Sequence, residues 1–314
     1  MAVEMNDQAN GAVAVAGGID LYELPEGCIA NALSLTSPRD ACRLSLVAST
    51  FRSAAQSDDV WERFLPPDYR DVLGRSAEGI KLLRSSMSKK ELYVRLCDEP
   101  ILIDNGTKSF SLEKSSGKKC YMLAASDLTI VWGDTPRYWK WISLSESRFA
   151  VVAELLDVCW LEIRGKIRSC MLSPDSTYAA YLVFSSRTRT YGFEYQPAEA
   201  SIVISGQEGQ KQAVHLDPDG AQRLRQHIRP RRRRGVFGLR QAALMSQPET
   251  IPTDSDVQYA KQRGDGWMEA KLGEIFINGG QDVELDMSLM EIKGGNWKSG
   301  LIVQGIEVRP KEGK

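Results

Sequence analysis

Cysteine, histidine and glutamate are the residues of this 314-residue chain whose side chains could bind a metal or catalyse a reaction. Neither His215 nor His227 lies at ligand spacing from a cysteine, and no cysteines are spaced as CxxC, which argues against a zinc site. We therefore predict no metal and no cofactor. The cysteines are expected to be reduced, packed thiols of a cytosolic or nuclear protein: Cys28, Cys42, Cys97, Cys120, Cys159 and Cys170.

Three glutamates, Glu154, Glu162 and Glu269, are the residues that a glycoside hydrolase could use as proton donor and nucleophile. Their positions in the sequence do not mark two of them as such a pair. The chain also has no Ser-His-Asp arrangement, phosphate-binding loop or dinucleotide fingerprint. A hydrolase is therefore the weakest of the functional hypotheses, and we assign no catalytic residue.

An arginine-rich segment from Arg229 to Gly235 is the one strong cluster of charge. It could be a nuclear-import signal, a site for nucleic-acid phosphates or a solvated loop. Nucleic acid has the least support, because no aromatic residues interleave with the arginines and the whole chain has a net charge of −1. The candidates for nuclear import are Arg231, Arg232, Arg233 and Arg234.

The elements that would position these residues belong to an ordinary globular protein, with 42% hydrophobic and 26% charged residues. We expect residues 1–20, which are small and polar, to be disordered. Their apolar run from Ala12 to Ala16 is too short for a signal peptide, and no stretch approaches the about 20 apolar residues of a membrane span. The sequence thus predicts neither secretion nor membrane insertion.

Residues 21–66 are predicted to form three short helices. Pro25 begins the first, Ser37 caps the second, and Ser57 caps a third that Pro66 ends. Apolar residues recur at helical spacing through the second helix: Ala41, Leu44, Ala48 and Phe51.

Residues 67–118 are predicted to be a helical linker, and residues 119–310 an antiparallel β-sandwich interrupted by a basic insertion at about 207–265. Residues 147–156 fit either a helical turn or a strand. The predicted strands are Tyr121–Ala124, Leu128–Trp132, Val158–Ile167, Tyr178–Ser185, Ser201–Ser205, Trp267–Ile277, Val283–Ile292 and Leu301–Val308.

The first helical segment closely resembles the F-box, through Leu24–Ile29, Ser37–Arg43, Val47–Arg52 and Asp59–Pro66. The resemblance implies docking on the Skp adaptor, and through it on cullin, in a ubiquitin ligase. Three short helices could not bury all of their apolar residues among themselves, so an adaptor helix would cover them; the alternative is that they pack on residues 70–96. The predicted adaptor contacts are Leu24, Pro25, Ile29, Leu33, Leu44 and Trp61.

The second domain resembles the plant phloem-protein-two-like lectin domain of the Nictaba type, through Thr129–Trp141, Val158–Ile167, Tyr178–Phe184 and Asp265–Glu269. The whole chain therefore resembles an F-box protein of the phloem-protein-two B class. Its fold class is expected to be α+β, with a small helical F-box followed by an antiparallel, lectin-like β-sandwich.

The second resemblance implies binding of N-acetylglucosamine oligomers or glycan cores by Trp132, Trp139 and Trp141. An indole can lie on the apolar C–H face of a pyranose, while Asp134, Arg137 and Tyr138 are candidate partners for its hydroxyls. Tryptophans also fill sandwich cores, and we expect one of these three to do so. Trp160, flanked by Leu161 and Ile163, is assigned to the core.

Together these features predict a substrate receptor: the F-box binds the adaptor and the sandwich captures a target protein, with glycoproteins among the expected targets. The alternative is a lectin-like protein whose ligase role is secondary. We expect cytoplasmic and nuclear localisation, no membrane partner and no nucleic-acid partner.

Overall fold

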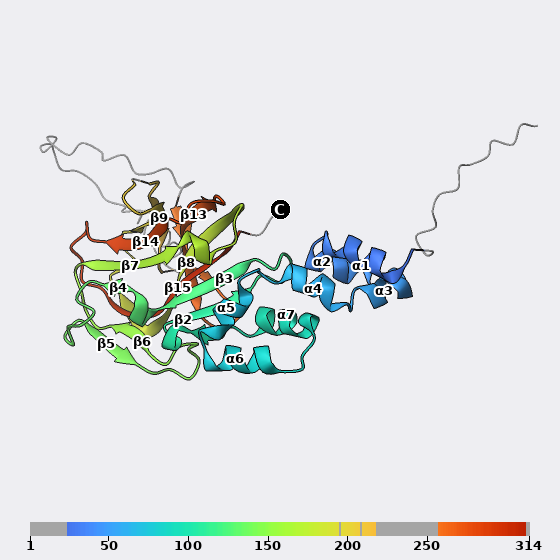
Figure 1. The fold of residues 1–314 in the computed structure, drawn as a ribbon. Coiled ribbons are helices and arrows are strands. Elements are labelled where there is room, and N and C mark those ends of the chain that lie inside the picture. The colour runs from blue at the N-terminus through green and yellow to red at the C-terminus, as the bar shows by residue number, and fades with distance from the viewer. Residues whose placement is uncertain (1–23, 195, 208, 218–256, 312–314) are drawn as a thin grey trace, which may run out of the picture.

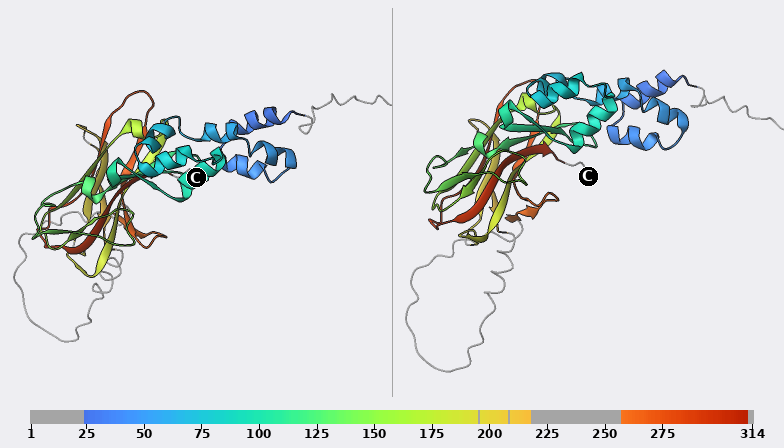
Figure 2. Two further views of the ribbon diagram at one scale, coloured as in Figure 1. Left: turned by 60° about the horizontal axis from the view of Figure 1, so that its bottom comes forward. Right: turned by 90° about the horizontal axis from the view of Figure 1, so that it is seen from below.

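The computed structural model describes residues 24–194, 196–207, 209–217 and 257–311. A run of helices projects from one end of a β-sandwich, so the described part of the chain is elongated (Figures 1 and 2). The predicted α+β fold class, with N-terminal helices followed by a largely antiparallel sandwich, is confirmed.

Four short helices, and not three, occupy residues 26–64. They are α1 (Glu26–Ser34), α2 (Pro38–Leu44), α3 (Ser49–Ala54) and α4 (Asp58–Phe64). Ser37 and Ser57 cap α2 and α4 as predicted, accepting hydrogen bonds from the backbone N–H groups of Asp40 at 3.1 Å and Asp59 at 3.3 Å.

The predicted second helix divides into α2 and α3 because the chain tightens after Leu44. The N–H groups of Leu46 and Val47 donate to carbonyls three residues back, and Ser45 Oγ donates to the carbonyl of Cys42 at 2.7 Å. Ala48 then takes an extended conformation with φ −151° and ψ 159°, which ends the turn. Helical spacing of apolar residues alone did not reveal this break.

The segment predicted as a helical linker contains three helices and the first two strands of the sandwich. The helices are α5 (Tyr69–Gly74), α6 (Ala77–Arg84) and α7 (Lys89–Asp98). The strands β1 (Ile101–Ile103) and β2 (Lys108–Leu112) pair antiparallel, and β2 pairs with β3 (Lys119–Ala124). The sheet therefore begins about twenty residues before the predicted boundary at residue 119.

Two sheets form the sandwich within the described residues. The nine-stranded sheet runs β1-β2-β3-β15-β8-β13-β12, with β6 also pairing with β15 and β5 pairing with β6. The six-stranded sheet runs β11-β10-β9-β14-β7-β4. The remaining strands are β4 (Thr129–Ile130), β5 (Trp139–Ile142), β6 (Val152–Leu155), β7 (Leu161–Arg168), β8 (Ser176–Tyr191), β9 (Ala198–Ile204), β10 (Gln212–His215), β11 (Val257–Tyr259), β12 (Lys261–Gln262), β13 (Met268–Ile277), β14 (Glu284–Glu291) and β15 (Ser299–Pro310).

Two details differ from the predicted strand pattern, and a third settles an alternative that it left open. The strand expected at Leu128–Trp132 ends at Ile130, because the chain then turns through Trp132, whose φ is +58°. Residues 147–156, left open between helix and strand, contain β6. Both ends of the predicted insertion form strands, and β10 and β11 pair parallel, which is a departure from a purely antiparallel sandwich.

One continuous hydrophobic core joins the helices to the sandwich, from Ile29 and Trp61 to Leu289 and Val308. Two contacts fix the junction. Lys119 Nζ, almost fully buried, donates to Asp68 Oδ2 at 2.8 Å and to the carbonyl of Cys170 at 3.2 Å. Gly117, with φ +72°, passes so close to the Phe64 carbonyl that a β-carbon would lie 2.6 Å from its oxygen.

Candidate functional site

Three of the predicted adaptor contacts are core residues of the chain itself. Ile29, Leu33 and Trp61 are each no more than 2% exposed. Trp61 packs against Tyr93 of α7, with ring centroids 5.1 Å apart, and its Nε1 donates to the carbonyl of Ala55 at 2.7 Å. Trp61 thus packs on a residue of segment 70–96, which was the alternative to an adaptor contact, whereas Ile29 and Leu33 lie on α1, which packs on α3 and α4. These three side chains are therefore buried within the chain and are not left for an adaptor to cover.

The most exposed aliphatic residues of the helical end are not among the predicted contacts. They are Leu35, Leu46 and Val47, which are 64%, 77% and 67% exposed, and we call them the aliphatic surface. They lie in the turns that follow α1 and α2. Of the other predicted contacts, Pro25 is exposed, and Leu24 and Leu44 are partly buried. The sequence did not predict the aliphatic surface, because Leu46 and Val47 fall between Leu44 and Ala48 of the apolar helical pattern and belong to the turn.

The predicted carbohydrate residues come together on one segment, the loop that follows β4 and the first residues of β5, at the end of the sandwich opposite α1 and α3 (Figure 1). Trp132 and Trp141 are each 40% exposed. Trp141 Nε1 donates to the carbonyl of Gly133 at 2.9 Å, which ties the second indole to the turn that carries the first. We call this segment, residues 131–141, the aromatic loop.

Polar and aromatic neighbours complete the aromatic loop. The rings of Trp132 and Tyr138 lie 5.2 Å apart with a 36° tilt, and the Arg137 guanidinium lies 5.8 Å from the centre of the Tyr138 ring. Asp134 is exposed and accepts a hydrogen bond from Thr135 Oγ1 at 3.3 Å. The loop thus offers two partly exposed indoles beside hydrogen-bonding groups, which is the chemistry that a sugar ring requires.

Two tryptophans do not have the exposure that their predicted roles require: one predicted sugar contact is buried, and one predicted core residue is exposed. Trp139 is 2% exposed and donates from Nε1 to the carbonyl of Val131 at 3.2 Å, so it is the core member of the predicted three and cannot contact a sugar. Trp160 was assigned to the core but is 43% exposed. Leu161 and Ile163 point inward along β7, and side chains alternate along a strand, so Trp160 falls in the outward phase with Glu162.

The three candidate hydrolase glutamates are not brought together as an acid and a nucleophile. Glu154 pairs with Arg187 at 2.8 Å, and Glu162 on β7 of the other sheet pairs with Arg164 at 2.6 Å. Glu269 on β13 pairs with Arg309 at 2.8 Å. Each carboxylate is therefore ion-paired with its own arginine, and no two of the three face one another as an acid and a nucleophile would.

An arginine–glutamate network, formed by Arg263, Glu269, Glu307 and Arg309, covers part of the nine-stranded sheet. Arg263 Nη1 lies 2.6 Å from Glu307 Oε2 and 3.1 Å from Glu269 Oε2. Burial by itself raises the pKa of Glu307, but Arg263 and the neighbouring arginines outweigh it, so the net pKa is lowered. The network is an ionised structural cluster.

Some predictions concern residues outside the described ranges. The nuclear-import candidates Arg231, Arg232, Arg233 and Arg234 lie there, as do the predicted disordered residues 1–20. Within the described residues, His, Cys, Asp and Glu side chains form no cluster that could hold a metal ion. Searched over the same residues, no helix has the length and apolar character needed to cross a membrane.

Comparison with known protein families gives two matches. A model described as phloem protein 2 matches residues 118–310, and an F-box domain model matches residues 21–63. Together the two ranges coincide with the sandwich and the four N-terminal helices, apart from β1 and β2.

Three relatives from Arabidopsis thaliana are similar along nearly the whole chain. F-box protein At2g02240 is 46% identical over 98% of this chain and 85% of its own length. F-box protein PP2-B1 is 43% identical over 92% of this chain and 89% of its own length. F-box protein PP2-B10 is 43% identical over 91% of this chain and 92% of its own length.

Proposed function

The chain belongs to the family of F-box proteins that carry a phloem protein 2 domain, and on that premise we propose that it is the substrate-recognition subunit of a Skp–cullin–F-box ubiquitin ligase. The observation that carries the proposal is the aliphatic surface on a folded F-box. Leu35, Leu46 and Val47 are aliphatic side chains exposed to more than half of their surface, and an adaptor helix would cover them.

Such a protein contributes proximity and not chemistry. F-box proteins are generally non-catalytic adaptors, and ubiquitin transfer is carried out by other subunits of the complex. The continuous core between helices and sandwich supports this role, because it holds the F-box and the sandwich in a fixed position relative to each other. A bound target would then be kept at a high effective concentration near the ubiquitin-conjugating enzyme.

The finer part of the proposal concerns what the sandwich captures. We propose that the aromatic loop recognises a glycan of the N-acetylglucosamine type on the target, with Trp132 and Trp141 contacting the sugar faces. Tyr138, Asp134 and Arg137 would serve the hydroxyl groups. A single site of this kind binds weakly, with a Kd near 1 mM or about −4 kcal/mol.

The second candidate function, a lectin-like protein whose ligase role is secondary, is favoured by the same two exposed indoles. A glycan array separates the two functions. Wild type and Trp132→Ala should differ in binding to chitooligosaccharides, with Trp297→Ala, an exposed tryptophan outside the loop, as the matched control. Equal signals for all three proteins would remove the aromatic loop as a glycan site and leave the ligase proposal standing.

Co-purification with a plant Skp adaptor tests the ligase proposal. Wild type should bind, and Leu46→Asp with Val47→Asp should abolish binding without unfolding the chain. Phe276→Asp, which changes an exposed apolar residue of the sandwich, is the matched control and should bind like wild type. The proposal fails if wild type does not bind under conditions in which a known F-box protein does.

We also propose that the protein occupies both cytoplasm and nucleus, on the basis of the arginine-rich segment. A fluorescent fusion of the full chain should be found in both compartments. Replacing Arg231, Arg232, Arg233 and Arg234 with alanine should shift it toward the cytoplasm; an unchanged distribution would indicate that the segment is a solvated loop.

A further inference from the structure

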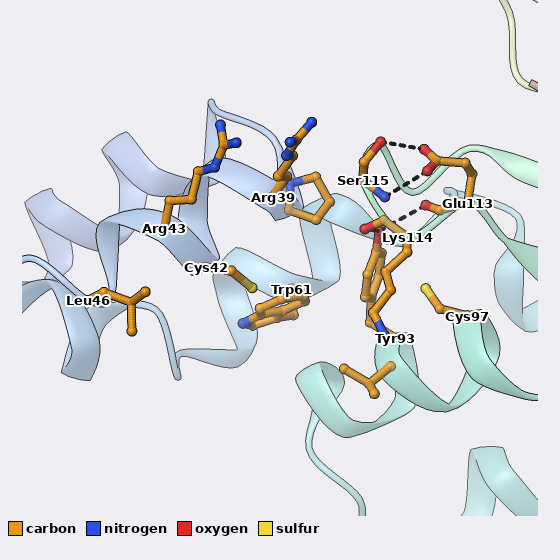
Figure 3. Close-up of a pocket in the computed structure, with 12 residues that line it drawn as sticks. Arg39, Cys42, Arg43, Leu46, Trp61, Tyr93, Cys97, Glu113, Lys114 and Ser115 are labelled. Carbon is orange, nitrogen blue, oxygen red and sulfur yellow. Dashed lines mark hydrogen bonds between the residues drawn. The ribbon is translucent and has the colours of Figure 1, made fainter. Parts of the chain in front are cut away.

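A cavity of about 490 Å³ lies between the F-box and the elements that follow it. Figure 3 shows Arg39, Cys42 and Arg43 of α2 on one side, facing Tyr93 and Cys97 of α7 and the hairpin that joins β2 to β3. Its volume falls in the range of about 300–1,000 Å³ that is typical of sites for small molecules. Neither the aliphatic surface nor the aromatic loop accounts for this cavity, although Leu46 lines its edge.

The walls of the cavity are apolar, because the polar atoms of the aromatic residues that line it are hydrogen-bonded within the chain. Leu46 and Val94, 77% and 38% exposed, supply accessible apolar side chain, whereas Trp61 and Tyr93 also line the cavity but are almost fully buried. The polar atoms of the two aromatic residues are engaged elsewhere: Trp61 Nε1 donates to the carbonyl of Ala55, and Tyr93 Oη donates to the carbonyl of Lys114 at 3.1 Å. Burial raises the pKa of the Cys97 thiol to about 12, so this wall stays uncharged.

The edge of the cavity is cationic. Arg39, Arg43 and Lys114 line it, and Glu113 is its one acidic residue. Both carboxylate oxygens of Glu113 accept hydrogen bonds within its own turn, from the N–H of Ser115 at 2.9 Å and the N–H of Ser116 at 2.8 Å. The acidic group is therefore hydrogen-bonded within the hairpin and forms no ion pair with Arg39, Arg43 or Lys114.

None of the three cationic side chains is held in a buried ion pair within the described residues. Among the described residues Arg39 has no ion-pair partner, and Arg43 lies 3.6 Å from Asp40 in a pair exposed to solvent. Lys114 pairs with Asp98 at 3.0 Å, again at the surface. Exposed pairs of this kind contribute little, about 0–1 kcal/mol, so an incoming anion could recruit these side chains at small cost.

From the apolar walls and the cationic edge we propose that the cavity binds a small organic anion: a molecule with an apolar, preferably aromatic, body and one carboxylate, sulfonate or phosphate group. The body would lie against the accessible side chains of Val94 and Leu46, and the anionic group would meet Arg39 and Arg43. A small molecule is favoured over a peptide because the walls come from four separate elements around a compact volume, and not from the two sides of a long groove.

The location gives such a ligand a consequence for partner binding. α2 and α4 belong to the F-box, whereas α7 and the hairpin belong to the region that fastens it to the sandwich. A bound ligand contacts both regions, and it lies beside Leu46 of the aliphatic surface. Occupancy of the cavity and adaptor binding should therefore change one another's affinity by the same factor.

A matched pair of fluorescent probes tests the proposal on the full chain. 1-Anilinonaphthalene-8-sulfonate carries an aromatic body and a sulfonate, and N-phenyl-1-naphthylamine has the same body without the charge. The sulfonate should bind one-to-one in the micromolar range, more tightly than the neutral probe. Arg39→Ala and Arg43→Ala should each weaken sulfonate binding about threefold and leave the neutral probe unchanged.

Two further variants separate the cavity from general surface effects. Val94→Trp should fill the cavity and weaken both probes at least about tenfold, with an unchanged melting temperature as evidence of folding. Arg52→Ala, which removes an exposed F-box arginine outside the cavity, should behave like wild type.

Three outcomes would overturn the proposal. The first is no one-to-one binding of the sulfonate, and the second is equal binding by wild type and the Arg39, Arg43 and Val94 variants. The third is found with the purified Skp adaptor: if adaptor binding is lost in Val94→Trp and the adaptor excludes the probe completely, the cavity is part of a protein interface.

Discussion

The helical end and the sandwich end of this molecule expose different kinds of apolar residue for different reasons. At the helical end, Leu35, Leu46 and Val47 are exposed because they lie in turns, while the apolar faces of the F-box helices are buried in a core that also contains residues of α7. At the sandwich end, Trp132 and Trp141 are exposed but held by a loop whose core anchor is Trp139. In both regions the exposed apolar residues lie beside buried aromatic residues of the same domain, Trp61 in the F-box and Trp139 in the sandwich.

The largest expected effect is on the shared core of the helical end. Trp61→Ala should lower the free energy of unfolding by about 4 kcal/mol, since it leaves a cavity between α4 and α7. Chemical denaturation measures the change. Trp297→Ala, at a tryptophan that is 47% exposed, should cost less than about 1 kcal/mol. Similar losses for the two variants would contradict the claim that Trp61 is a core residue.

The sandwich has its own stability determinant in the arginine–glutamate network. Glu307→Gln should cost about 3 kcal/mol at neutral pH, because it leaves Arg263 and Arg309 with one carboxylate fewer. The folded pKa of Glu307 lies below its ordinary value of 4.5, so its contribution is present above that pH and is lost as the pH falls through the lowered pKa.

The pH dependence of this network is measurable by denaturation between pH 7 and pH 3. Wild type should lose more stability than Glu307→Gln on acidification, because the variant has already lost the titrating group. Glu146→Gln, at an exposed glutamate, should follow wild type. Parallel curves for Glu307→Gln and wild type would show that the network does not stabilise the fold.

A pair of substitutions in the aromatic loop separates its two roles. Trp139→Ala should destabilise the protein by about 3 kcal/mol, whereas Trp132→Ala should change stability by less than about 1 kcal/mol. If the loop binds a glycan, Trp132→Ala should also weaken that binding about fivefold, or about 1 kcal/mol. Thermal unfolding and glycan titration check the two expectations, and equal destabilisation would contradict the assignment.

The smallest effect is expected at Trp160. Its indole is 43% exposed and donates to Glu162 Oε2 at 2.9 Å, so Trp160→Phe should change the free energy of unfolding by less than about 0.5 kcal/mol. A loss of 2 kcal/mol or more would restore the core role that the sequence suggested.

Sequence predicted the elements that depend on local chemistry better than those that depend on packing. The caps at Ser37 and Ser57 and the strands with strong alternation were predicted, because neighbouring residues specify them. β1 and β2 were not, since each is short and gains its strand character by pairing with the rest of the sheet. The burial of Trp61 likewise involves Tyr93 of α7, which no F-box motif includes.

The candidate site divides in the same way. Residue type pointed to the tryptophans of residues 132–141, but their exposure is decided by the turn at Trp132 and by which face of β5 each side chain occupies. For Trp160, the alternation of Leu161 and Ile163 along the strand was enough to predict an outward-facing indole. The aliphatic surface needed the break after Leu44, which results from turn hydrogen bonds that apolar spacing does not reveal.

Hydrogen–deuterium exchange of the full chain, with and without a plant Skp adaptor, tests most directly whether the F-box end binds the adaptor and leaves the sandwich end free. We expect adaptor binding to slow exchange over residues 35–47, where the aliphatic surface lies, and to leave exchange in the aromatic loop at residues 131–141 unchanged. Protection of the aromatic loop in place of residues 35–47, or no protection at saturating adaptor, would contradict this expectation.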